Sequence, residues 1–215
     1  MTLTLGVLIS GRGSNLEAVL GAIKSGEVDA RVAVVVSNNP AAPGLSIACD
    51  YGAEAVGIDP NGYPNRSDYE AAVVERLNAH QVEWIVLAGY MKLVGKTLLH
   101  AFPNRMINIH PSLLPAFKGL DAQKQALDAG VKESGCTVHI VTLKMDDGPI
   151  LGQVSVPVLP GDTVETLSQR ILVEEHRLLP RVIQGLNSPP PQLSPSGEIE
   201  GPASLPTDRG GRTTR

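Results

Sequence analysis

The chain has 215 residues, of which 42% are hydrophobic and 19% charged, and its formal net charge is −4. A chain of this length can form one domain that buries about 70% of its unfolded surface. The acidic balance argues against nucleic-acid and anionic-membrane binding, which show as an excess of Lys and Arg. Two cysteines are too few for a disulfide framework, and no apolar run is long enough to span a bilayer. We therefore expect a cytoplasmic protein.

Short apolar runs alternate with helical patterns in the first half of the chain. Strands are predicted at 3–9, 31–37 and 84–88, and helices at 14–25, 43–52 and 66–80. The Val and Ile runs are continuous rather than alternating, which suits parallel strands covered on both faces. Strands that alternate with helices indicate an α/β fold, so we expect a mostly parallel, Rossmann-like twisted sheet flanked by helices.

The second half of the chain adds further strands and a long C-terminal helix. Strands are predicted at 105–110, 135–142 and 150–158, a helix at 121–129, and a long helix that is capped by Asp162 or Thr163 and ends near Gly185. The segment 188–215 is rich in Pro, Ser and Gly and has few large apolar residues, so it cannot repay its ordering entropy. We expect a folded domain at 1–187 and a disordered tail at 188–215.

The first chemical signal is the loop Ser10-Gly11-Arg12-Gly13-Ser14-Asn15, between the first strand and the first helix. In open α/β sheets, ligands bind beyond the carboxyl ends of strands, where glycines let backbone N–H groups approach an anion at a helix N-terminus. No Lys-Ser/Thr pair follows, and Leu16 stands where a dinucleotide fingerprint has its third glycine. The loop therefore predicts a site for a single phosphate. The alternative is an ordinary glycine turn capped by Ser14.

The strongest signal is the run Asn108-Ile109-His110-Pro111 at the end of a strand. Alternate side chains of a strand share a face, so Asn108 and His110 point the same way, and Pro111 keeps His110 extended. An amide donor beside an imidazole can stabilise an oxygen that becomes negative during acyl transfer. The alternative is a histidine that a backbone carbonyl satisfies.

Two acidic positions complete the candidate site. The segment Asp146-Asp147-Gly148-Pro149 is either a plain turn or a loop in which one carboxylate faces His110 and favours its charged form. On the last helix, Glu175 falls near the centre of an apolar stripe of Val164, Leu167, Ile171, Leu178 and Val182. A carboxylate there must be paired or must line a pocket, so Glu175 is a ligand-binding residue or part of a structural ion pair.

The other histidines give weaker signals. His139 lies in an apolar strand and is interpreted as a core or sheet-surface residue rather than a ligand. No cluster of His, Cys and Asp has the spacing of metal ligands, so no metal site is expected.

Several separated motifs resemble, in order, those of the glycinamide ribonucleotide transformylases, a folate-dependent formyltransferase family. The resemblance runs from about residue 5 to residue 185. It rests on Ile9-Ser10-Gly11-Arg12-Gly13-Ser14-Asn15-Leu16, Leu87-Ala88-Gly89-Tyr90-Met91-Lys92, Asn108-Ile109-His110-Pro111-Ser112-Leu113-Leu114-Pro115, Asp146-Asp147-Gly148-Pro149 and Glu174-Glu175-His176. It implies that the amine of glycinamide ribonucleotide attacks the formyl carbon of 10-formyltetrahydrofolate directly, without an acyl-enzyme, in purine biosynthesis.

The resemblance also implies roles for individual residues. The catalytic set would be Asn108, His110 and Asp146. The substrate phosphate would bind Gly11, Arg12, Gly13, Ser14 and Asn15, with Glu175 on the ribose. The folate would contact Arg66, Met91, Lys92, Leu93, Val94, Asn108, Thr142, Leu143, Lys144, Met145 and Asp146. No metal, nucleic acid or membrane takes part, and the protein would be a monomer or homodimer.

The chain departs from the family pattern at two places. Asp147 stands where a second glycine is more usual, and residues 118–124 carry no histidine. Three alternatives stay open at this point. A formyltetrahydrofolate hydrolase usually has an additional N-terminal regulatory domain, and a methionyl-tRNA formyltransferase has a longer, basic C-terminal domain. A binding protein for folate or phosphoribosyl ligands would have lost its turnover.

Overall fold

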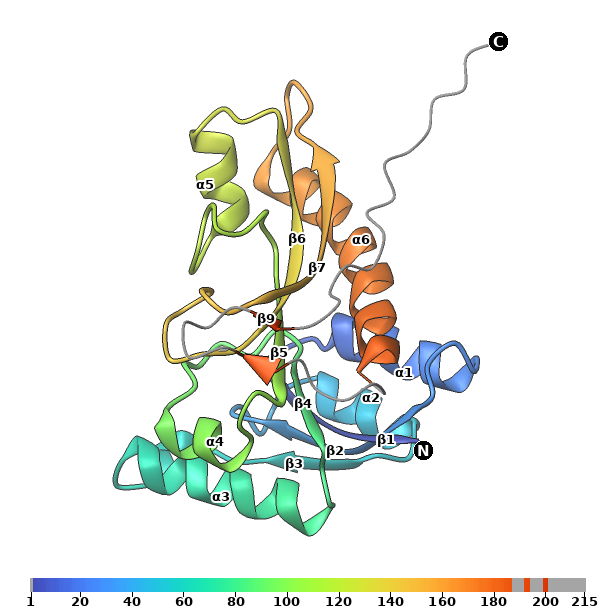
Figure 1. The fold of residues 1–215 in the computed structure, drawn as a ribbon, viewed down its shortest axis with the longest axis vertical. Coiled ribbons are helices and arrows are strands. Elements are labelled where there is room, and N and C mark those ends of the chain that lie inside the picture. Colours follow the sequence, from blue (N-terminus) through green and yellow to red (C-terminus); the bar gives the residue numbers. More distant parts are fainter. Residues whose placement is uncertain (1, 187–191, 194–198, 201–215) are drawn as a thin grey trace.

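The computed structural model describes residues 2–186, 192–193 and 199–200. Within them, seven strands form one sheet in the order β3-β2-β1-β4-β5-β6-β7 (Figure 1). The strands are β1 (Leu3–Ile9), β2 (Ala30–Ser37), β3 (Glu54–Gly57), β4 (Trp84–Leu87), β5 (Met106–His110), β6 (Glu133–Ile140) and β7 (Ile150–Pro157). Neighbouring strands from β3 to β5 are parallel, whereas β6 is antiparallel to both β5 and β7. The predicted mostly parallel α/β fold is therefore confirmed.

Helices cover both faces of the sheet. They are α1 (Ser14–Lys24), α2 (Gly44–Asp50), α3 (Arg66–Ala79), α4 (Lys96–Ala101), α5 (Ala122–Asp128) and α6 (Val164–Gly185), with a short 3₁₀ turn, η1 (Pro60–Gly62). Val7 of β1 packs into the core under α1 and α6, while its neighbour Leu8 packs into the core under α3 and α4. Successive strand residues point to opposite faces, so one continuous apolar strand supplies both cores.

The site lies where the strand order reverses. The chain builds outward from β1 through β2 to β3, then returns to place β4 on the other side of β1. The loop that follows β1 leads to α1 on one face of the sheet, and the loop that follows β4 leads to α4 on the other. At such a switch point, ligands of open α/β sheets bind in the crevice outside the carboxyl ends of the strands. The β6–β7 hairpin extends past the rest of the sheet, between α5 and α6 (Figure 1).

The structure contains elements that the sequence patterns do not indicate. The strand β3 and the helix α4 have four and six residues, too few to show a clear hydrophobic period. The predicted tail at 188–215 lies outside the described residues, apart from a short antiparallel pair, β8 (Gln192–Leu193) with β9 (Ile199–Glu200). The boundary at 187 and the disorder of the tail stay predictions. In the part of the chain that the structure describes, no helix has the length and apolarity to cross a membrane.

Candidate functional site

The crevice brings the loop after β1 against the loop after β4. The Ser10 N–H donates to the Gly89 carbonyl at 3.2 Å, and the Met91 N–H donates to Ser10 Oγ at 2.7 Å. Leu87 of β4 pairs in register with Asn108 of β5. The residues predicted to bind phosphate, those predicted to bind folate and the predicted catalytic residues therefore meet along one edge of the sheet.

The glycine loop ends at an uncapped helix N-terminus. Gly13 occupies the N-cap position of α1 with φ 82°, and no side chain caps the helix among the described residues. Ser14 is the first residue of the helix rather than its cap. A Cβ on Gly13 would lie 2.8 Å from the Gly44 Cα, so glycine is required both for this backbone conformation and for the close approach of α2. The first-turn N–H groups can bind an anion.

His110 has an acceptor at each ring nitrogen. Its Nε2 donates to the Phe117 carbonyl at 2.9 Å, and its Nδ1 lies 3.5 Å from Asp146 Oδ2. The side chain is buried beneath the loop that follows β5. A carbonyl and a carboxylate both accept, so each ring nitrogen of His110 faces an acceptor.

His139 is the residue whose position the sequence patterns missed. It is 2% exposed, as expected for a core residue, but it also contacts two predicted catalytic residues. Its Nε2 lies 3.2 Å from Asn108 Nδ2 and 3.5 Å from Asp146 Oδ1, while its Nδ1 donates to the Ile140 carbonyl at 2.9 Å. The neutral ring thus accepts from Asn108 at Nε2, whereas the protonated ring donates from Nε2 to Asp146. The contact follows from the cross-strand pairing of His139 with Asn108, which no local sequence pattern indicates.

The two adjacent aspartates have different partners. Asp146 accepts a 2.8 Å hydrogen bond from the Gly119 N–H besides its contacts with the two histidines, and its backbone adopts φ 49°. Burial would raise the pKa of Asp146, but hydrogen bonds from His139 and Gly119 and the charges of both histidines lower that pKa overall. Asp147 instead forms an ion pair with Lys118. Asp146 is therefore the carboxylate that faces His110.

Glu175 joins the long helix to the glycine loop. It is 6% exposed, and its Oε2 accepts from Asn15 Nδ2 at 2.8 Å. Burial raises the pKa of Glu175, and the hydrogen bond from Asn15 opposes that shift only in part. Within the described residues, the buried Asn15 Oδ1 has no hydrogen-bond partner. The pair thus holds a buried carboxylate and a buried amide oxygen whose capacity to accept hydrogen bonds is only partly used.

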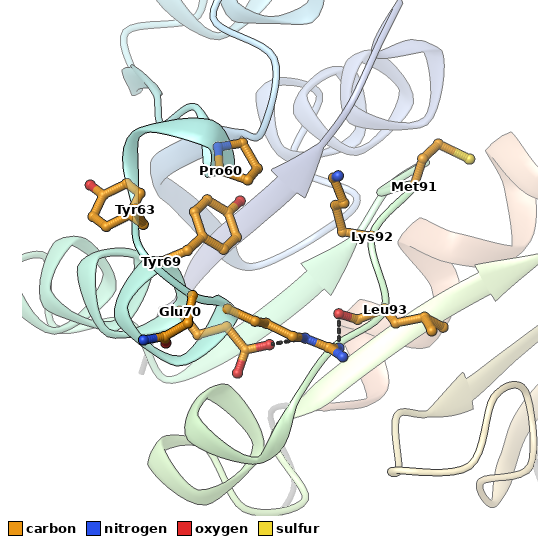
Figure 2. Close-up of a pocket in the computed structure, with 9 residues that line it drawn as sticks. Pro60, Tyr63, Tyr69, Glu70, Met91, Lys92 and Leu93 are labelled. Atoms are coloured by element: carbon orange, nitrogen blue, oxygen red, sulfur yellow. Dashed lines mark hydrogen bonds and ion pairs between the residues drawn. The ribbon is translucent and has the colours of Figure 1, made fainter.

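A cavity of about 500 Å³ lies between α3 and the loop after β4 (Figure 2). In Figure 2, Tyr63 and Tyr69 lie on one side and the Met91–Leu93 segment on the other. The lining residues are Pro60, Tyr63, Asn65, Arg66, Tyr69, Glu70, Met91, Lys92 and Leu93. This lining includes four of the residues predicted to contact folate, but not Val94, Asn108 or residues 142–146.

Arg66 lies in the wall of this cavity. Its Nε donates to Glu70 Oε1 at 3.1 Å, and its Nη2 donates to the Leu93 carbonyl. The buried Glu70 carboxylate also accepts from the Leu98 N–H at 3.2 Å, which ties α3 to α4. The guanidinium is therefore held at the cavity wall, where it can meet an anionic group. Among the described residues, no group of three or more His, Cys, Asp and Glu side chains could hold a metal ion.

Comparison with known proteins gives consistent matches over most of the chain. The formyl transferase family profile matches residues 4–183. Phosphoribosylglycinamide formyltransferase of Bacillus subtilis (strain 168) is 45% identical over 185 residues, 85% of this chain and 95% of that protein. The Escherichia coli (strain K12) protein of the same name is 36% identical over 82% of this chain and 84% of its own length. The crystal structure of glycinamide ribonucleotide transformylase 1 from Symbiobacterium toebii has a TM-score of 0.84 and 55% identity, covering 85% of this chain and 86% of that one.

Proposed function

The chain belongs to the formyl transferase family, and on that basis we propose that it is a phosphoribosylglycinamide formyltransferase acting in purine biosynthesis. It transfers the formyl group of 10-formyltetrahydrofolate to the amine of glycinamide ribonucleotide. The observation that carries the proposal is the cluster of Asn108, His110 and Asp146 at the carboxyl edge of the sheet. We further propose that it works in the cytoplasm as a monomer or homodimer.

The proposed reaction is a direct acyl transfer. The amine lone pair forms a bond to the formyl carbon, and the formyl oxygen becomes an oxyanion. Asn108 Nδ2 and the His110 imidazolium donate hydrogen bonds to that oxygen, while Asp146 keeps His110 oriented and charged. The bond from carbon to N10 of the folate then breaks, and the proton that the amine loses ends on N10. The products are formylated glycinamide ribonucleotide and tetrahydrofolate.

The substrate groups are assigned by the chemistry of each part of the crevice. The N-terminus of α1 and residues Gly11–Asn15 suit the phosphate, and the Asn15–Glu175 pair suits the ribose hydroxyls. The cavity beside Arg66 suits a carboxylate-bearing part of the folate, since a guanidinium binds carboxylates well. Two ligands held in register can contribute about 7–11 kcal/mol to the rate through proximity alone.

A spectrophotometric assay with glycinamide ribonucleotide and 10-formyl folate tests the proposal. We expect turnover that requires both substrates and that falls about a hundredfold to a thousandfold in His110→Ala, because one oxyanion donor is lost. Loss of formyl folate without the amine substrate would indicate a hydrolase instead. Tight binding of both ligands by a folded sample without turnover would indicate a binding protein.

A further inference from the structure

Three consecutive residues, Phe117 to Gly119, contact the region of the catalytic histidine and aspartate from one side. The Phe117 carbonyl accepts from His110 Nε2 at 2.9 Å, and the Gly119 N–H donates to Asp146 Oδ2 at 2.8 Å. Between them, Lys118 forms an ion pair with Asp147. We call residues 117–119 the clamp. The backbone of the clamp forms hydrogen bonds with His110 and Asp146, and the side chain of Lys118 pairs with Asp147.

The backbone on both sides of this contact is held in an unfavourable conformation. Phe117 has φ 54° and Asp146 has φ 49°, both in the left-handed region that non-glycine residues rarely adopt. Such conformations persist only when surrounding contacts hold them. Gly148 supplies one such constraint, because a Cβ there would lie 1.8 Å from the Ile140 carbonyl oxygen. The preceding residues of the loop are held by polar contacts, among them the hydrogen bond from the Gly119 N–H to Asp146 and the ion pair of Asp147 with Lys118.

The charges around Asp147 favour the ion pair. Hydrogen bonding and charge from Lys118 lower the pKa of Asp147, so its carboxylate is ionised at neutral pH. Lys144 Nζ lies 3.8 Å from the other carboxylate oxygen. Both side chains of the Lys118–Asp147 pair are about one-third exposed, so the pair is accessible to salt. The Lys118–Asp147 ion pair thus joins the clamp to the 142–147 loop, and added salt can weaken it.

We propose that Lys118 and Asp147 form a latch that positions Asp146 and His110 for formyl transfer. Lys118 and Asp147 pair with each other, and they act on His110 and Asp146 through the clamp. The latch keeps the Gly119 N–H on the Asp146 carboxylate, and Asp146 in turn orients His110. This inference rests on the proposed function, since it assigns positioning residues for that reaction.

Substitutions that remove one charge of the latch test this inference. Lys118→Met and Asp147→Asn should each lower kcat about twofold to fivefold at low salt, the range expected for an exposed ion pair. KM for glycinamide ribonucleotide and the melting temperature should change little. The double variant should lose no more than either single variant, because the two residues form one contact. Asp147→Glu should retain most of the activity.

Salt and a remote ion pair provide the controls. Raising ionic strength from about 0.05 M to about 0.5 M should lower wild-type kcat toward that of Asp147→Asn, while the variant should respond less. Asp128→Asn removes the exposed Lys124–Asp128 pair of α5, which lies outside the clamp, and should leave kcat unchanged. Equal kcat values for wild type, Lys118→Met and Asp147→Asn would overturn the latch.

Amide exchange at Gly119 tests the latch without any enzyme assay. In glycine-labelled protein, the Gly119 N–H should exchange at least about twofold faster in Asp147→Asn than in wild type, because local opening governs exchange. Unchanged exchange would also overturn the latch. A wild-type protein that fails to transfer formyl groups would contradict the proposed function, yet the exchange measurement would still decide whether Lys118 and Asp147 hold the clamp.

Discussion

The side chains of Asp146 and Glu175 are both largely buried, but their pKa values are shifted in opposite directions. Asp146 receives a backbone N–H and two histidines, and its pKa is lowered. Glu175 receives one amide donor in an apolar layer, and its pKa is raised. The fold itself thus compensates the charge of Asp146. For Glu175 the compensation is incomplete, which agrees with the proposal that a ligand donates hydrogen bonds to it.

Replacing Asp146 should produce the largest effect. Asp146→Asn keeps the side-chain volume but removes the charge that faces His110. We expect kcat to fall on the order of a hundredfold, since His110 would no longer be held as a charged donor. Steady-state kinetics beside Asp147→Asn measures the contrast. A larger loss in Asp147→Asn would show that the wrong carboxylate has been assigned to His110.

Replacing Glu175 should weaken the binding of glycinamide ribonucleotide but stabilise the folded protein at high pH. Glu175→Gln can still accept from Asn15 but carries no charge, so KM for glycinamide ribonucleotide should rise roughly tenfold or more, as for the loss of a charged hydrogen bond of about 1.5–3 kcal/mol. Because the folded pKa is raised, ionisation of Glu175 costs stability as pH rises above its ordinary value near 4.5. Urea unfolding should therefore show the variant more stable than wild type at about pH 8, and equal to it near pH 4. Parallel stability curves would refute the raised pKa.

Replacing His139 should have a smaller effect on turnover. It tests whether the contacts of His139 with Asn108 and Asp146 matter for the reaction. His139→Phe removes the ring nitrogen that contacts Asn108 and Asp146 while it fills the same space. We expect kcat to fall about tenfold, and less when Asn108 is already Ala, because residues in contact are not additive. The double-mutant cycle measures this coupling. Full additivity would mean that His139 only fills the core.

Much of the site follows from simple periodicities. A period of two places Asn108 beside His110, and a period of 3.6 places Glu175 inside an apolar stripe, where it is indeed buried. Each inference needs only one element, so local sequence is sufficient. The fold class follows in the same way from continuous Val and Ile runs such as 31–37.

The remaining features depend on how separate elements meet. His139 reaches Asn108 only because β6 runs antiparallel to β5 in one particular register, which no local pattern specifies. Asp146 and Asp147 are adjacent and chemically identical, so which one faces the histidines depends on the conformation of the loop, in which Asp146 has φ 49°. Likewise, Tyr69 and Glu70 join the cavity wall through the packing of α3 against the loop after β4, and Tyr63 joins it from the segment between η1 and α3.

The Phe117 carbonyl already accepts a hydrogen bond from His110 Nε2, so a substrate oxygen must compete with it for this N–H group. In the proposed reaction, a neutral formyl oxygen would gain little by displacing a neutral peptide oxygen from Nε2–H, so this donor would add little to the affinity for formyl folate. The oxyanion would be a much stronger acceptor and would displace the carbonyl with a net gain. The hydrogen bond from His110 would then be made to the transition state and not to the bound substrate, which is the condition under which an interaction raises kcat.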